Sequence, residues 1–250
     1  MGSVGELTAS ALERAARVDL AAAFRLAVRL DLHEGVCNHF SVMLAEGQTF
    51  LLNRYGLHWS EVTASNLLAL DAGGRLLAGD GEYEKTAFWI HSRIHLAHPH
   101  AACVLHTHMP HATALTLLED GRLEMVEQNA LRFYDDIAYD DTYNGLVVDE
   151  AEGDRLARVL GTRRVLFLAN HGVIVVGATV AEAFDSLYYL ERACRLQVLA
   201  RMMGGKRRPV RPEVVERTYR LMLTDAPQYA GAHFSALKRI LDREEPAYSR

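Results

Sequence analysis

The sequence is poor in cysteine, in excess basic charge and in long apolar runs. Its three cysteines, Cys37, Cys103 and Cys194, are odd in number and far apart, so we expect reduced thiols in or near the core of a cytoplasmic protein, and no disulfide framework. The net charge of −5 offers no basic field for nucleic acid or an anionic membrane. Neither a signal peptide nor an apolar stretch of about 18 residues is evident, so no membrane segment is expected.

Several catalytic motifs are also missing. No glycine-rich loop of the kind that binds phosphate occurs, and no serine nucleophile elbow. His91 and His95 have the i, i+4 spacing that suits zinc, but Ser92 stands where a zincin carries its glutamate. We therefore interpret these two histidines as a helix face packed near a polar cleft.

Half of the residues are hydrophobic, which is ample for a core in a chain of 250 residues. We expect a single domain over residues 1–250, with a C-terminal helical tail at about 206–250. Apolar spacing predicts helices at about 7–32, 84–97, 110–118, 149–160 and 179–203, two more after Pro212, and strands at 38–45, 49–52, 67–71, 75–77, 101–106, 165–169 and 173–176. In the second helix Phe88, Ile90, Ile94 and Leu96 mark the predicted core face.

Short turns join several of the predicted strand pairs, one of them Glu46-Gly47-Gln48. Such turns connect antiparallel neighbours, whereas parallel strands need long crossovers. The sequence therefore predicts an α/β protein with three α/β/α layers and a central, mainly antiparallel sheet.

The most informative stretch is His106-Thr107-His108, which ends the apolar run from Ala101. Side chains two apart on a strand point to the same side, so both imidazoles can face one divalent cation. The alternative is a pair of hydrogen-bonded histidines at an exposed strand end.

A third histidine has the same setting in Asn170-His171-Gly172, directly after a second apolar run. Three imidazoles from two strand ends would leave a coordination position open, as in catalytic metal sites. Taken alone, this tripeptide also fits a plain turn in which Gly172 supplies a positive φ. The three histidines together favour a metal site at His106, His108 and His171.

These histidines belong to a wider pattern. With Cys37-Asn38-His39-Phe40-Ser41-Val42, His91, Pro99 and the helix at 179–199, the sequence resembles the class II aldolase/adducin family over roughly residues 12–200. The resemblance implies an α/β/α fold around an antiparallel sheet, and a homotetramer with sites at subunit interfaces. It also implies a divalent metal, usually zinc and sometimes manganese or cobalt, that stabilises an enediolate in retro-aldol cleavage, epimerisation or decarboxylation.

The departures from the family pattern lie in the substrate pocket. Sugar-phosphate aldolases of the family carry S-S-E where this chain has Lys85-Thr86-Ala87, and T-G where it has Tyr55-Gly56. The acid/base glutamate is thus replaced by alanine, which points to the adducin-like branch.

We expect Asn38, Tyr55, Gly56 and Thr86 to contact the substrate, and Lys85 to hold a carboxylate as a catalytic residue. Glu127 is the candidate replacement proton carrier. The alternatives are a solvated lysine in the first helical turn and a surface carboxylate.

Three functions remain open at this stage. The leading hypothesis is a metal-dependent lyase that acts on a small hydroxy- or oxo-carboxylate, by retro-aldol cleavage or decarboxylation. The second is an Fe(II)-dependent oxygenase that acts on an arylpyruvate-like acid. The third is a non-catalytic scaffold like the adducins, although a scaffold does not need three convergent imidazoles.

Overall fold

The computed structural model describes residues 9–44 and 48–250. Its helices are α1 (Ala9–Arg29), α2 (Lys85–Ala97), α3 (Pro110–Thr116), α4 (Glu150–Leu160), α5 (Val180–Met202) and α6 (Pro212–Glu244). Its strands are β1 (His39–Met43), β2 (Thr49–Leu52), β3 (Leu68–Asp71), β4 (Leu76–Ala78), β5 (Cys103–Thr107), β6 (Ile137–Asp140), β7 (Val165–Leu168) and β8 (Gly172–Gly177). Glu46 and Gly47 of the predicted turn lie outside the described residues.

The strands form one sheet in the order β4-β3-β2-β1-β5-β8-β7-β6. Each neighbouring pair is antiparallel except β6 and β7, which are parallel. The predicted α/β class and mainly antiparallel sheet are confirmed. Strand β6 was not predicted, because an edge strand with three half-buried residues out of four lacks a strong apolar run.

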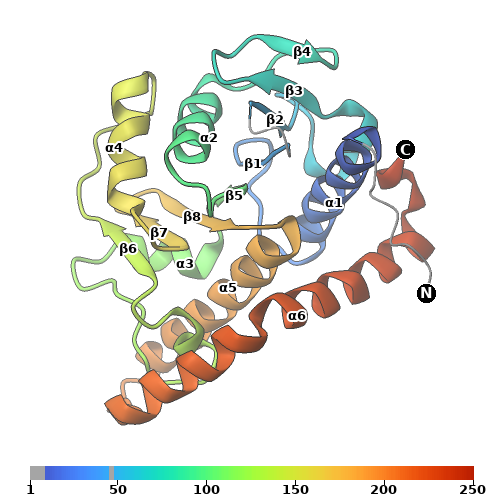
Figure 1. Cartoon of the computed structure of the whole chain (residues 1–250). Coiled ribbons are helices and arrows are strands. Elements are labelled where there is room, and N and C mark those ends of the chain that lie inside the picture. Colours follow the sequence, from blue (N-terminus) through green and yellow to red (C-terminus); the bar gives the residue numbers. More distant parts are fainter. Residues whose placement is uncertain (1–8, 45–47) are drawn as a thin grey trace.

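Helices cover both faces of the sheet (Figure 1). The alternation of β5 assigns the faces, because Cys103 and Leu105 join the core beneath α1 and α5, while Val104 joins the core beneath α2 and α4. His106 lies two residues after Val104 and therefore faces α2. The strand that carries the candidate ligands is thus buried at the centre of the sheet.

Side-chain caps fix where three helices begin. Glu84 accepts a hydrogen bond from the Ala87 backbone N–H at the start of α2, and Asp149 and Thr179 cap α4 and α5 in the same way. Each cap satisfies a backbone donor that a helix N-terminus leaves without a partner. The caps predicted at Asp149 and Thr179 are confirmed.

The C-terminal tail differs from the prediction. Instead of two helices, residues 212–244 form one α-helix that runs through Pro227. Buried contacts lie on both sides of the proline, with Val215 before it and Phe234 after it, and the Phe234 ring lies 5.7 Å from that of Phe184 in α5. Packing against α5 therefore outweighs the backbone hydrogen bond that a proline removes.

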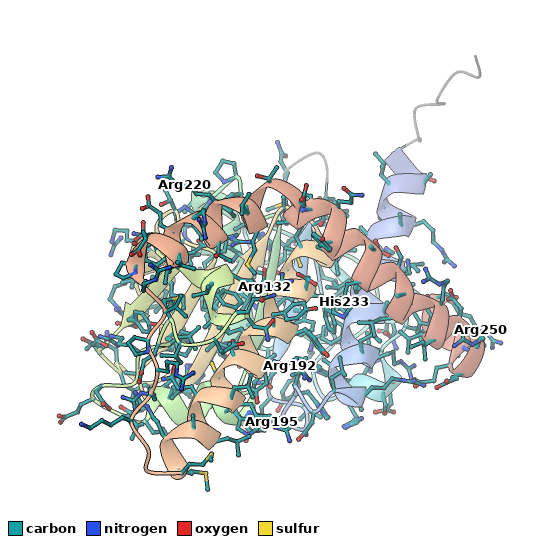
Figure 2. The ribbon with its side chains drawn as sticks, turned by 90° about the horizontal axis from the view of Figure 1, so that it is seen from below. Arg132, Arg192, Arg195, Arg220, His233 and Arg250 are labelled. Carbon is teal, nitrogen blue, oxygen red and sulfur yellow. The ribbon has the colours of Figure 1, made fainter. Side chains whose placement is uncertain are left out.

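A buried carboxylate ties α6 to the rest of the molecule. Asp185 in α5 accepts hydrogen bonds from His233 of α6, at 2.8 Å, and from Arg132, at 3.2 Å. Arg132 and His233 are labelled in Figure 2. The Arg132 guanidinium also lies 3.9 Å from the centre of the Tyr189 ring. The hydrogen bond from His233 to Asp185 thus connects the long C-terminal helix to α5.

Two residues are more exposed than predicted. Leu96, assigned to the core face of α2, is 46% exposed because it lies on the side of the helix opposite to the buried residues Ala87 and Ile94. Cys37 is exposed in the loop before β1, whereas Cys103 and Cys194 are buried as expected. Among the described residues, no helix is both long and apolar enough to cross a membrane.

Candidate metal centre

His106 and His108 lie at the end of β5 and face the same side of the strand. Their Nε2 atoms are 3.2 Å apart, and His106 is buried while His108 is partly exposed. The period of the strand accounts for this convergence, because Thr107 points away between them. The geometry expected from the H-x-H spacing is present.

His171 approaches the same point from the turn between β7 and β8. Its ring centre lies 4.8 Å from those of both His106 and His108. One ligand atom from each of the three residues lies within 4.8 Å of the others. We refer to His106, His108 and His171 as the three-histidine cluster.

The turn before His171 differs from the plain turn that was the alternative to a metal site. The left-handed residue is Asn170, at φ +57°, and not Gly172. Asparagine tolerates this region better than most side chains, and its backbone N–H is held by the Thr116 carbonyl.

Gly172 is required for another reason, which is close packing. A Cβ at this position would lie 2.6 Å from the Thr107 carbonyl oxygen and 2.7 Å from the His108 ring. The absent side chain therefore lets β8 approach β5 and gives the His108 ring its place.

Hydrogen bonds fix the tautomers of two of the three imidazoles. His106 Nδ1 donates to the Val173 carbonyl oxygen at 3.0 Å, and His108 Nδ1 donates to the carboxylate of Glu34. In each neutral ring the proton is then on Nδ1 and the lone pair is on Nε2. Carbonyl and carboxylate acceptors of this kind commonly orient metal-bound histidines.

The donor set therefore fits a divalent cation. Two Nε2 lone pairs that face each other at 3.2 Å repel unless a positive charge lies between them. Two ligands at zinc–nitrogen distances of about 2.0–2.1 Å in a tetrahedral arrangement are separated by roughly 3.3 Å. Glu34, which the sequence reasoning missed, adds negative charge behind His108.

Burial keeps the cluster in the form that binds metals. It lowers the pKa of His106 well below its usual value, and neighbouring His171 lowers it further. Burial, followed by His108, also lowers the pKa of His171 to about 4. His106 and His171 are therefore neutral at physiological pH, as ligation requires.

Asn38 lies directly beside the cluster. Its Oδ1 accepts a hydrogen bond from the His108 backbone N–H at 3.3 Å. Its Nδ2 is buried without a hydrogen-bond partner. A buried amide donor without a partner, next to candidate ligands, is an unmet hydrogen-bond requirement that a bound group can meet.

In the described part of the chain, no hydrogen bond or ion pair joins the other predicted site residues to the cluster. Lys85 is exposed at the first position of α2, and Thr86 donates to the capping carboxylate of Glu84. Tyr55 is 55% exposed, and Gly56 follows it at φ +80° in the loop after β2.

Glu127 has a structural role that its sequence position did not indicate. Its carboxylate accepts hydrogen bonds from the backbone N–H groups of Asn129, at 2.8 Å, and Ala130, at 2.6 Å. These bonds hold the start of a short 3₁₀ helix over Ala130–Phe133.

A second group of polar residues lies buried between β1 and α2. His39 is paired with His106 across the two strands, and their ring centres are 4.8 Å apart. His39, Ser41, His91 and His95 form a continuous hydrogen-bonded chain that we refer to as the buried relay. The predicted polar packing of His91 and His95 is therefore observed, with partners that the sequence did not identify.

The fold and the three-histidine cluster define the class of protein, an α/β/α domain with a candidate site for a divalent cation at the centre of its sheet. The family model for the Class II Aldolase and Adducin N-terminal domain matches residues 18–198. The chain belongs to this family.

Individual relatives agree with this assignment. A protein of Caulobacter vibrioides named for the class 2 aldolases is 34% identical over 243 residues, which cover 96% of this chain and 94% of that protein. Mouse alpha-adducin is 35% identical over 198 residues, which cover 77% of this chain and 26% of the adducin.

Solved structures show the same architecture. An aldolase II superfamily protein from Pseudomonas syringae has a TM-score of 0.86 at 32% identity, with 96% of both chains covered. L-fuculose 1-phosphate aldolase from Glaciozyma antarctica PI12 also has a TM-score of 0.86, with 100% of this chain and 97% of that chain covered. At 23% identity the latter likeness concerns the fold alone.

Proposed function

We propose that the protein is a metal-dependent carbon–carbon lyase that acts on a small hydroxy- or oxo-carboxylate, by retro-aldol cleavage or decarboxylation. The observation that carries this proposal is the pair of Nε2 lone pairs on His106 and His108, 3.2 Å apart and joined by His171. Membership of the class II aldolase and adducin family supports it.

The three-histidine cluster is the proposed metal site, and zinc is the proposed ion, with manganese, cobalt or iron as the other candidates. Such an ion supplies Lewis acidity that offsets negative charge as it develops on the substrate. The chain's own contribution is to present three neutral imidazoles and to exclude water on the side of the sheet where His106 is buried.

Two further side chains suit an acidic substrate. Asn38 Nδ2 has no partner and can donate to a substrate oxygen. Lys85 forms no ion pair within residues 9–44 and 48–250, so its ammonium remains free to attract a carboxylate. Tyr55, Gly56 and Thr86 complete the proposed substrate contacts.

Glu127 can act as the proposed proton carrier only if subunits assemble so that it reaches the site of a neighbour. Its carboxylate caps a 3₁₀ helix within its own chain, so we propose that it serves the site of a neighbouring subunit in a homotetramer. Sedimentation of the purified protein measures this assembly, and a monomer would remove Glu127 from the mechanism.

Metal analysis of the purified protein tests the proposal. We expect about one equivalent of metal per chain, lost together with activity in His106→Ala. His100→Ala is the matched control, because His100 lies outside the cluster, with a 3.4 Å contact to the Arg163 carbonyl and its ring 5.3 Å from that of His98.

The reaction is then assigned by its products. Release of carbon dioxide or an aldehyde from a panel of small hydroxy and oxo acids supports the lyase. Iron-dependent oxygen uptake with an arylpyruvate-like acid would instead show that the protein is an oxygenase. A chain that binds no metal, and that shows no thermal shift with zinc, manganese or iron, would be an adducin-like scaffold instead.

A further inference from the structure

The buried relay begins at a group that can only accept a hydrogen bond. His95 Nδ1 lies 2.7 Å from the Ala101 carbonyl oxygen. A carbonyl has no proton, so His95 must donate from Nδ1, and its neutral ring then accepts at Nε2. One backbone group thus sets the tautomer of a side chain in α2.

The tautomer of His95 determines the direction of every other hydrogen bond in the relay. Ser41 lies 2.7 Å from His95 Nε2 and must donate to it, so its oxygen accepts from His91 Nδ1. His91 Nε2 is then an acceptor, and His39 Nδ1 donates to it at 2.7 Å. Each link has only one arrangement in which every donor meets an acceptor.

The rings are neutral, as this argument requires. All four residues are at most 7% exposed. Removing a charged imidazole from water is costly, so this burial favours the neutral form of each ring.

The relay therefore ends in a lone pair on His39 Nε2. This nitrogen has no hydrogen-bond partner among the described residues, and it is not among the buried atoms sealed from solvent. The His39 ring stacks on that of His106, with an angle of 30° between their planes. The free acceptor thus borders the three-histidine cluster.

We propose that His39 contacts the substrate as a hydrogen-bond acceptor, and that it selects a 2-hydroxy acid, whose hydroxyl donates, over the matching 2-oxo acid, whose carbonyl cannot. Ser41, His91 and His95 are positioning residues that act through His39. This inference rests on the proposed function and narrows its substrate class from hydroxy- or oxo-carboxylates to the former.

Calorimetric binding of lactate and pyruvate to the zinc-loaded full-length protein tests the inference, because the two acids differ only at C2, which carries a hydroxyl in lactate and is a carbonyl in pyruvate. The readout is the ratio of the two Kd values, which general damage to the site does not move. Removing one hydrogen-bond partner in His39→Phe should lower the preference for lactate by about fivefold to tenfold. His100→Ala should leave the ratio unchanged.

Ser41→Ala tests the relay without touching His39. It removes the acceptor of His91 Nδ1, so the His39 proton is free to move to Nε2, where it would favour pyruvate. The ratio should fall or invert, and Ser41→Thr, which keeps the hydroxyl, should restore it.

The outcomes separate the two proposals. A lactate preference that falls in His39→Phe and Ser41→Ala supports the inference. Binding of both acids with one ratio in the wild type and in His39→Phe overturns the inference and leaves the lyase proposal intact. If neither acid binds the zinc-loaded wild type, the inference is overturned, and the metal analysis and the product assays decide the proposed function separately.

Discussion

Two groups of histidines lie side by side between β5, β1 and α2, and they use their nitrogens in opposite ways. In the three-histidine cluster, the Nδ1 atoms of His106 and His108 are bound to oxygen acceptors, so both lone pairs converge. In the buried relay, every nitrogen except His39 Nε2 is paired within the chain. The hydrogen-bond acceptors behind the rings, and not the number of histidines, therefore determine where a metal can bind.

The largest effect is expected from filling the space at Gly172. Gly172→Ala would place a methyl group 2.6 Å from the Thr107 carbonyl oxygen and 2.7 Å from the His108 ring. We expect the cluster to lose metal affinity by more than about 100-fold, because a displaced ligand ring breaks the coordination geometry. Zinc competition with a chelator measures it.

Gly205→Ala is the control for that substitution, because no atom lies within 4 Å of the added methyl group. Wild-type zinc affinity in Gly172→Ala would show that His108 is not held by this close approach.

Lowering the pH should reduce the free energy of unfolding even while His95 is still neutral in the folded protein. Burial lowers the pKa of His95 to about 4 in the folded protein, against 6.5 unfolded. Between these values the unfolded chain binds the extra proton, so the stability from this group falls as the pH falls. The loss is about 1.4 kcal/mol per pH unit, or about 3 kcal/mol in all.

Urea unfolding of the metal-free protein from pH 7 to pH 4 measures this loss. His95→Gln lacks the titrating group, so the stability difference between it and the wild type should narrow as the pH falls. A constant difference across the range would contradict the assignment of a neutral, buried His95.

Breaking the relay at its centre should affect stability but not metal binding. Ser41→Ala leaves His91 Nδ1 and His95 Nε2 without partners in a buried layer. We expect a cost of about 2 kcal/mol in the free energy of unfolding, with zinc content unchanged. Ser92→Ala is the matched control, since its buried hydroxyl has no partner to lose. An equal loss of unfolding free energy in Ser41→Ala and Ser92→Ala would show that the relay does not stabilise the fold.

The smallest effect is expected behind His108. Glu34→Gln keeps an oxygen acceptor for His108 Nδ1 but removes the negative charge. We expect zinc affinity to fall about tenfold with little change in stability, as for other residues that orient a metal ligand. Glu82→Gln, an exposed residue of the same charge, should leave zinc affinity unchanged. Unaltered affinity in Glu34→Gln would mean that the carboxylate does not support the ligand.

The sequence predicted what depends on local periodicity. A strand that ends in His106-Thr107-His108 must present both rings on one side, and the strand limits at β2 and the caps of α4 and α5 were recovered for similar local reasons. The strand β6 and the single helix α6 were missed, because tertiary packing decides them.

The relay could not be derived because it depends on register. The pairing of β1 with β5 brings together His39 and His106, which are 67 positions apart. The packing of α2 on β1 brings His91 to Ser41, 50 positions away. Glu34 was missed for the same reason, since it reaches His108 from a loop 74 positions earlier.

The antiparallel pairing of β5 with β8 has a mechanical consequence. His106 and the Val173 carbonyl that orients it are 67 positions apart in the chain, and His171 stands just before that carbonyl. An ion bound by these rings would link β5 to the end of β8, two neighbouring strands that are far apart in the chain. Removal of the ion by a chelator should therefore destabilise the centre of the sheet first. It should also lower the melting temperature of the protein.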